Sequence, residues 1–130
     1  ETGLVDERTF FRCLDELMAM LANQGSKKIH YKLHPGQHVD PRYAPRLRKM
    51  LKGNRYGVDF RELPASFCLE ILATTGRPCF YIFISSVGYY AAVSGCRVYS
   101  MASRLAAINA RYKVIKDIIP EVMSRRISFL

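Results

Sequence analysis

The sequence predicts an α/β fold in which a parallel β-sheet is flanked by helices. Segments whose apolar residues recur at helical spacing alternate along the chain with short strand-like segments, and this alternation is typical of parallel sheets with helical crossovers. One strand-like segment, residues 79–84 (C-F-Y-I-F-I), is apolar without interruption, as expected for a strand covered by helices on both faces. With 130 residues, of which 49% are hydrophobic, the chain is large enough to bury a core.

The first half of the chain is expected to begin with a helix at residues 6–23, where apolar side chains recur at helical spacing until Gly25 provides a stop. Residues 28–33 (K-I-H-Y-K-L) alternate between polar and apolar side chains, which predicts a strand. A short basic helix is predicted over residues 41–51, and a second strand over residues 56–60.

The second half is expected to continue the same alternation. Pro64 suits the first turn of a helix, because its missing N–H would have no partner there. Pro120 closes the last helix. In chain order, the expected elements are helix, strand, helix, strand and helix at residues 64–74, 79–84, 87–94, 97–100 and 103–118.

We find no internal repeat and no domain boundary, so residues 1–130 are predicted to form a single domain. Because the chain opens with a helix, and with Glu1 rather than Met, we expect a fragment whose first strand is missing. No stretch approaches the roughly 18 consecutive apolar residues of a membrane-spanning helix. The four cysteines lie far apart without a C-x-x-C pair, which favours free thiols in a reducing compartment over disulfides or a zinc site.

The chain has a formal net charge of +9, from 20 Lys and Arg against 11 Asp and Glu. The basic residues concentrate in residues 41–58, which contain no acid, and again near the C-terminus. They are Arg42, Arg46, Arg48, Lys49, Lys52 and Arg55 in the first region, and Lys113, Lys116, Arg125 and Arg126 in the second. Such a surface attracts polyanions, anionic lipid or anionic sugars, unless it is only a solvated helix face without a partner. The first region lacks interleaved aromatic residues, so no nucleic-acid partner is expected.

Ligands of open parallel sheets bind at the carboxyl ends of the strands. The third predicted strand ends at Ser85 and Ser86, where a helix begins. A helix N-terminus offers unpaired N–H groups and partial positive charge, and two hydroxyls add donors, so this point suits a phosphate. Gly88 would let the backbone approach such a ligand closely. The alternative interpretation is that one of the serines serves only as the N-cap of the helix.

The first predicted strand ends at His34, which Pro35 follows. Its imidazole could donate to a phosphate oxygen or protonate a leaving group near neutral pH, or it could instead bond only to its own loop. Glu70, in the helix predicted after Pro64, could hold sugar hydroxyls or could be an ordinary exposed residue. The other two strands lead to Leu63, Pro64, Ser100 and Ser103.

Several common enzyme motifs do not occur in the sequence. There is no P-loop and no G-x-G-x-x-G, which disfavours an ordinary dinucleotide site, and there is no G-x-S-x-G elbow of a serine hydrolase. The sequence also lacks an acidic cluster suited to a metal, so neither a metal nor another cofactor is expected.

Three motifs in order carry a resemblance to a known family: K-L-H-P (32–35), E-L-P-x-S-x-x-L-E (62–70) and I-S-S-V-G-Y-Y-A-A (84–92). Over about residues 28–102, the chain resembles the C-terminal nucleotide-binding half of bacterial sialyltransferases, in particular the capsular α-2,8-polysialyltransferases and their lipooligosaccharide relatives. The resemblance implies a Rossmann-like domain that forms the C-terminal half of a GT-B glycosyltransferase. This would bind CMP-sialic acid as the donor and transfer sialic acid to a capsule polysaccharide or lipooligosaccharide acceptor.

The resemblance also implies roles for individual residues. His34 would contact the CMP phosphate and protonate or stabilise it as it leaves, and Ser85 and Ser86 would hydrogen-bond the same phosphate. The donor site implied in this way consists of His34, Pro35, Leu63, Pro64, Glu70, Ser85 and Ser86, with Leu63 and Pro64 near the cytosine and Glu70 near the ribose. The family's general base lies in an acidic-acidic-Gly motif of the N-terminal half, which this sequence lacks, so the isolated chain is expected to bind the donor without catalysing transfer.

Two other functions remain open from the residues. One is a glycosyltransferase domain that uses another nucleotide sugar, such as a UDP donor. The other is a non-enzymatic basic α/β module that binds polyanions or a membrane. For the transferase, we expect a cytoplasmic location with peripheral contact on the inner face of the bacterial membrane. The residues expected to make that contact are Arg42, Arg46, Arg48, Lys49 and Lys52.

Overall fold

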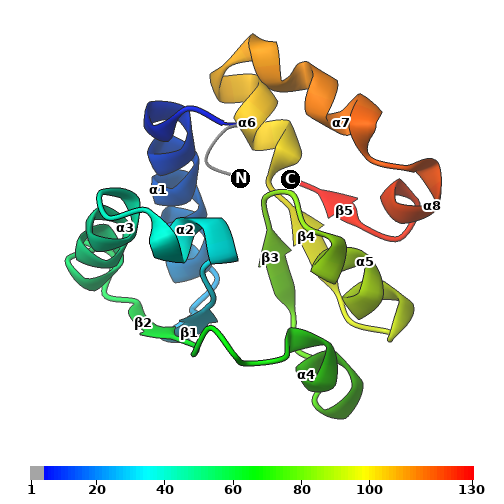
Figure 1. Ribbon diagram of the computed structural model, residues 1–130, viewed down its shortest axis with the longest axis horizontal. Helices are drawn as coiled ribbons and strands as arrows, with labels where there is room; N and C mark the ends of the chain where they lie inside the picture. Colours follow the sequence, from blue (N-terminus) through cyan, green and yellow to red (C-terminus); the bar gives the residue numbers. More distant parts are fainter. Residues whose placement is uncertain (1–4) are drawn as a thin grey trace. The chain divides into compact units, whose positions relative to one another are not determined.

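The computed structural model describes residues 5–130, without the side chains of residues 38 and 39. The chain divides into two compact units, Glu1–Phe67 and Cys68–Leu130, which we call the first and the second unit (Figure 1). Each unit contains a small parallel β-sheet flanked by helices, which confirms the predicted α/β class. The strands form two separate sheets, with the orders β1-β2 and β3-β4-β5. The expectation of a single nucleotide-sugar-binding domain over residues 1–130 stays a prediction.

The first unit has two parallel strands joined by a helical crossover. Lys28 of β1 lies opposite Asp59 of β2, and Tyr31 lies opposite Glu62. In chain order, its elements are α1 (Glu7–Asn23), β1 (Lys28–Tyr31), α2 (Pro35–Val39), α3 (Tyr43–Lys52) and β2 (Asp59–Glu62).

Helix α1 begins at a side-chain cap and buries one apolar face. A carboxylate oxygen of Asp6 accepts a hydrogen bond from the backbone N–H of Thr9 at 2.9 Å, which satisfies an otherwise unpaired donor of the first turn. The helix ends before Gly25, whose φ of 80° favours glycine. The ring of Phe11 lies 5.7 Å from that of Tyr43 in α3, so the two helices are in contact.

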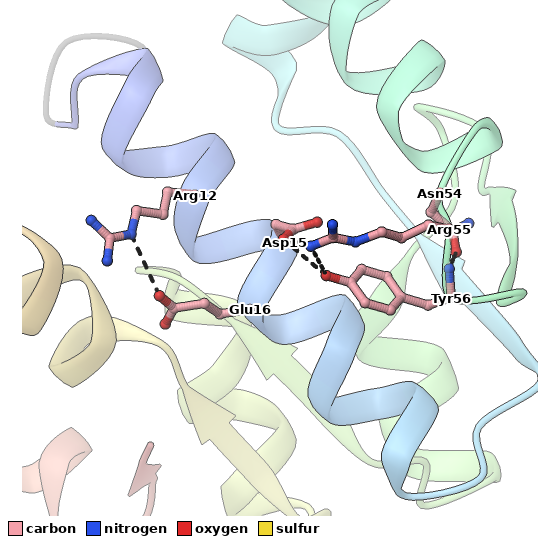
Figure 2. Close-up of polar contacts among 6 residues, drawn as sticks. All are labelled: Arg12, Asp15, Glu16, Asn54, Arg55 and Tyr56. Carbon is pink, nitrogen blue, oxygen red and sulfur yellow. Dashed lines mark hydrogen bonds and ion pairs between the residues drawn. The ribbon is translucent and has the colours of Figure 1, made fainter.

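A polar contact also fastens α1 to the loop before β2 (Figure 2). Oδ2 of Asp15 accepts hydrogen bonds from the Tyr56 hydroxyl at 2.9 Å and from Nη2 of Arg55 at 3.1 Å. The side chain of Asn54 bonds the backbone at both ends of this loop, donating to the carbonyl oxygens of Leu51 and Val58. The second predicted strand therefore begins later than expected: residues 56–58 belong to the loop, and β2 starts at Asp59.

The second unit has three parallel strands in the order β3-β4-β5. Helix α5 connects β3 to β4, and a series of short helices connects β4 to β5 (Figure 1). Its core contains Ala73, Ala91, Cys96, Val98 and Ile127. In chain order, the elements are α4 (Leu69–Thr75), β3 (Phe80–Ile82), α5 (Ser86–Val93), β4 (Val98–Ser100), α6 (Ala102–Ile108), the 3₁₀ helix η1 (Ala110–Lys113), α7 (Val114–Ile118), α8 (Glu121–Ser124) and β5 (Ser128–Phe129).

Two helix predictions in the second half need correction. The helix expected over residues 64–74 starts only at Leu69, because the backbone N–H of Phe67 donates to the Pro64 carbonyl oxygen at 2.9 Å and closes a turn there. The single helix expected over residues 103–118 is broken at Asn109, whose extended backbone (φ −144°, ψ 110°) cannot continue a helix. The Asn109 side chain accepts from the N–H of Arg111 at 3.2 Å and starts η1.

Three short elements were not expected from the sequence: α2, α8 and β5. Each has five residues or fewer, which is too short for hydrophobic periodicity to reveal. Within the described residues, no helix combines the length and the apolar character needed to cross a membrane.

Candidate functional site

His34 follows β1, after Lys32 and Leu33, as the N-cap residue of α2. Its Nδ1 accepts a hydrogen bond from the backbone N–H of Gly36 at 3.2 Å. Its own backbone N–H donates to Oε1 of Gln37 at 2.9 Å, which completes a reciprocal capping box. His34 is therefore bonded to its own loop, which is the alternative that the sequence left open.

This capping bond has a chemical consequence for the other ring nitrogen. Because Nδ1 of His34 accepts a hydrogen bond, the neutral ring carries its proton on Nε2. The side chain is exposed, and within the described part of the chain Nε2 has no hydrogen-bond partner. The ring is thus oriented by its own helix while one N–H remains available as a donor.

Ser85 is the N-cap residue of α5 and follows β3 after Phe83 and Ile84. Its Oγ accepts from the backbone N–H of Val87 at 3.3 Å, and its carbonyl oxygen accepts from the N–H of Gly88 at 3.2 Å. A hydroxyl that accepts a capping bond can still donate its own proton. Ser86 is the first residue of the helix and is exposed. The two hydroxyls therefore sit at the start of an eight-residue helix, where an anion is favoured.

Gly88 is needed for packing rather than for approach to a ligand. The residue is buried, and a Cβ added to it would clash with Cδ1 of Ile82 in β3 and lie 3.3 Å from Cγ1 of Val98 in β4. Helix α5 therefore rests on the sheet through this glycine. The expectation that Gly88 frees the backbone for a ligand is wrong, and its effect on the site is to fix the position of the Ser85 cap.

Leu63 and Pro64 follow directly after β2. The N–H of Leu63 donates to the carbonyl oxygen of Tyr31 at 2.7 Å, which extends the pairing of the two parallel strands by one bond. Leu63 is half-buried and Pro64 is exposed. Because β1 and β2 are parallel neighbours, His34 and Leu63 both follow the carboxyl ends of strands in the same sheet.

Glu70 lies in the first turn of α4 and is exposed. Its Oε2 accepts a hydrogen bond from Sγ of Cys68 at 3.2 Å. Glu70 lies in a helix, as the sequence predicts, although that helix starts five residues later than predicted. An exposed carboxylate in this position is able to accept hydrogen bonds from hydroxyl groups.

The predicted site residues fall into both units. The first unit holds His34, Pro35, Leu63 and Pro64, all next to the carboxyl ends of β1 and β2. The second unit holds Glu70, Ser85 and Ser86, with both serines next to the carboxyl end of β3. Ser100, at the end of β4, is buried: its Oγ donates to the carbonyl oxygen of Phe83 at 3.0 Å and accepts from the N–H of Ala102 at 3.2 Å. Ser100 thus holds the end of the sheet together.

One polar cluster was not found from the sequence. Arg48 of α3 binds both carboxylate oxygens of Glu62, at 2.7 and 2.8 Å, and the Tyr31 hydroxyl donates to Oε2 of Glu62 at 2.9 Å. Burial, followed by the hydrogen bond to Glu62, raises the pKa of Tyr31 to about 12. Glu62 and Arg48 each stood in a motif or a basic region of the sequence, but no pattern indicated that they pair.

The basic region around α3 is partly neutralised. Three of its arginines form ion pairs with acids elsewhere in the first unit: Arg46 with Glu7, Arg48 with Glu62, and Arg55 with Asp15. The remaining exposed cations, for which the described residues show no ion pair, are Arg42, Lys49 and Lys52. The surface available to an anionic partner is therefore smaller than the sequence indicated.

Among the residues that the structure describes, no group of three or more His, Cys, Asp or Glu side chains could hold a metal ion. Comparison of the chain with protein-family models, with curated proteins and with solved structures finds no match.

Proposed function

We propose that the chain is the donor-binding half of a sialyltransferase that transfers sialic acid from CMP-sialic acid to an anionic glycan or glycolipid acceptor. The observation that carries the proposal is the placement of His34 and Ser85, each as a helix cap three residues after the last residue of a parallel strand. Together with the three motifs described above, this placement supports a GT-B donor domain with a Rossmann-like architecture. The expected acceptor is capsule polysaccharide or lipooligosaccharide.

The proposed chemistry needs hydrogen-bond donors where negative charge develops. When the bond from sialic acid to CMP breaks, the sugar becomes cation-like and the phosphate oxygen of CMP gains charge. Nε2–H of His34 would donate to this oxygen, and the hydroxyls of Ser85 and Ser86 would donate to the same phosphate. Donors fixed before the reaction favour the transition state over the ground state, because they need no reorganisation as the charge forms.

The remaining roles follow from the same assignment. Pro35, Leu63 and Pro64 would line the cytosine side of the site, and Glu70 would accept hydrogen bonds from the ribose hydroxyls. The general base that activates the acceptor hydroxyl is expected in the N-terminal half of a GT-B enzyme. The chain alone is therefore expected to bind CMP without catalysing transfer, and no metal is required by these steps.

Titration calorimetry of the 130-residue chain with CMP tests the proposal. Two substitutions separate ligand contacts from helix capping. His34→Asn keeps a good capping acceptor and removes the imidazole Nε2 donor. Ser85→Asp also keeps a cap but places a carboxylate beside the phosphate. Both should weaken CMP binding by about tenfold or more, the scale of one lost charge-assisted hydrogen bond.

Matched controls are present in the same elements. His30 is an exposed histidine on β1, and Ser94 stands at the opposite end of α5 from Ser85. His30→Asn and Ser94→Ala should leave the affinity for CMP unchanged. A wild-type chain that binds UDP as well as CMP would instead favour a transferase with a different nucleotide sugar, and binding of neither nucleotide would refute a donor domain.

The exposed residues Arg42, Lys49 and Lys52 support a second candidate function, in which the chain contacts anionic membranes or polyanions through α3. Replacing these three residues by Gln leaves the ion pairs of Arg46 and Arg48 intact. The triple variant should lose binding to vesicles of anionic lipid while keeping its affinity for CMP. Equal vesicle binding by the variant and the wild type would exclude α3 as the contact.

A further inference from the structure

A small open pocket lies in the second unit, among α6, η1 and α7. The break at Asn109 ends α6 and lets the following short helices fold back beside it, which creates a hollow that an unbroken helix would not have. Its volume of about 330 Å³ falls at the lower end of the range typical of small-molecule sites, roughly 300–1,000 Å³. The residues that line it are Ser103, Ala106, Ala107, Lys113 and Lys116.

The charged residues that line the pocket are all positive. Both lysines are exposed, and across the described residues neither forms an ion pair with an acid. The Nζ of Lys116 lies 5.2 Å from the centroid of the Phe129 ring, a cation–π contact, and it has no hydrogen bond to another of the described residues. Asp117 is the next residue in the chain, but it does not line the pocket. The residues that line the hollow thus include two lysines and one serine and no acid.

We propose that this pocket binds the phosphoryl group of a ligand. Lysine ammonium groups bind phosphate as compact point charges, and the hydroxyl of Ser103 adds a further donor. Because the side chains of Ala106 and Ala107 are small, they leave room in the pocket for the ligand. The inference uses none of the residues assigned to CMP, so it stands or fails separately from the proposed function.

Pyrophosphate is the probe for the first test, with the amide resonances of the full chain followed by NMR. Saturable shifts are expected within residues 103–116. The Lys113→Gln/Lys116→Gln variant should bind about tenfold more weakly or worse, since each lost bond to a charged group weakens binding on that scale. The control is Arg97→Gln/Arg126→Gln, which removes two exposed positive charges elsewhere in the same unit and should leave binding within about twofold.

A second variant separates a shaped site from general attraction to a basic surface. Ala107 is exposed, so Ala107→Phe should fold normally, keep both lysines and fill the hollow. Loss of the pyrophosphate shifts in this variant supports the pocket. The proposal is overturned if Ala107→Phe binds like the wild type, if the arginine control weakens binding as much as the lysine variant, or if no shifts arise within residues 103–116.

The same variants distinguish the source of the phosphoryl group. Vesicles of phosphatidylglycerol, compared with phosphatidylcholine, present it as a lipid headgroup. Vesicle binding that Ala107→Phe and the lysine variant both abolish supports a headgroup ligand. Pyrophosphate binding that is sensitive to both variants, without vesicle binding, supports a phosphorylated solute instead.

Discussion

Arg48 in α3 holds both carboxylate oxygens of Glu62 at the end of β2, with its Nε 2.7 Å from Oε2 and its Nη2 2.8 Å from Oε1. Oε2 also accepts from the Tyr31 hydroxyl of β1 at 2.9 Å. One carboxylate therefore joins the crossover helix to both strands of the first sheet. Glu62 directly precedes Leu63 and Pro64, so this cluster fixes the backbone from which the proposed cytosine contacts extend.

The Arg48–Glu62 pair is expected to contribute measurably but modestly to folding. Its side chains are 44% and 25% exposed, and pairs of this kind couple by about 0.5–1 kcal/mol because water screens them. A double-mutant cycle with Arg48→Met and Glu62→Gln, read from the free energy of unfolding in urea, should return a coupling of that size. A cycle for the more exposed Arg61–Asp59 pair is the control and should return less. Equal coupling in both cycles would contradict the role assigned to Glu62.

Tyr31 should make stability fall at high pH. Its pKa is raised to about 12 in the folded chain by burial and by Glu62, whereas an unfolded tyrosine titrates near pH 10. The stabilisation is therefore complete below about pH 10 and is lost as the pH rises from 10 towards 12. Unfolding followed across this window should show a smaller loss for Tyr31→Phe than for the wild type. Tyr81, whose pKa burial also raises to about 12, supplies a second variant, Tyr81→Phe, with an independent effect.

The sequence predicted the longer elements well because periodicity is a reliable signal there. The helix expected over residues 6–23 is α1, and the alternating residues 28–33 contain β1. The signal failed where a single side chain decides the local structure. Asn109 breaks a run of helical spacing by capping η1, and the turn closed at Pro64 removes that residue from the helix that it was expected to open. Neither event changes the apolar pattern, so neither can be seen in it.

The candidate site was predictable in part. That His34 and Ser85 follow strand ends could be inferred from the end of the alternating segment 28–33 and of the apolar segment 79–84, and both are found there as helix caps. The bond from Gly36 to Nδ1, which selects the ring tautomer, depends on the backbone of α2, a helix that no pattern indicated. The pairing of Arg48 with Glu62 depends on how α3 lies against β2, which is a tertiary relationship.

The thiols of the four cysteines should react at two different rates. Cys68 and Cys79 are exposed, whereas Cys13 and Cys96 are buried. A chromogenic disulfide reagent should therefore titrate two thiols rapidly in the native chain and all four after unfolding, since access limits the attack of a thiol on the reagent. Cys68→Ser and Cys79→Ser should each remove one fast equivalent. Reaction of more than two thiols at the fast rate under native conditions would contradict the packing of α1 or of the second core.

Gly88→Ala tests whether the packing of α5 controls the proposed phosphate contact. The added methyl group would meet Cδ1 of Ile82, the end of a side chain that can turn, and would lie 3.3 Å from Cγ1 of Val98. We expect Ile82 to change its rotamer and α5 to shift slightly, at a cost of about 1–3 kcal/mol in the free energy of unfolding. Because Ser85 caps the same helix, the shift should also weaken CMP binding. Gly76→Ala is the matched control: its neighbours stand at ordinary distances of 3.7 Å or more, so stability and binding should stay close to wild type. A Gly88→Ala chain that is destabilised but binds CMP with unchanged affinity would contradict the idea that the packing of α5 controls the phosphate contact.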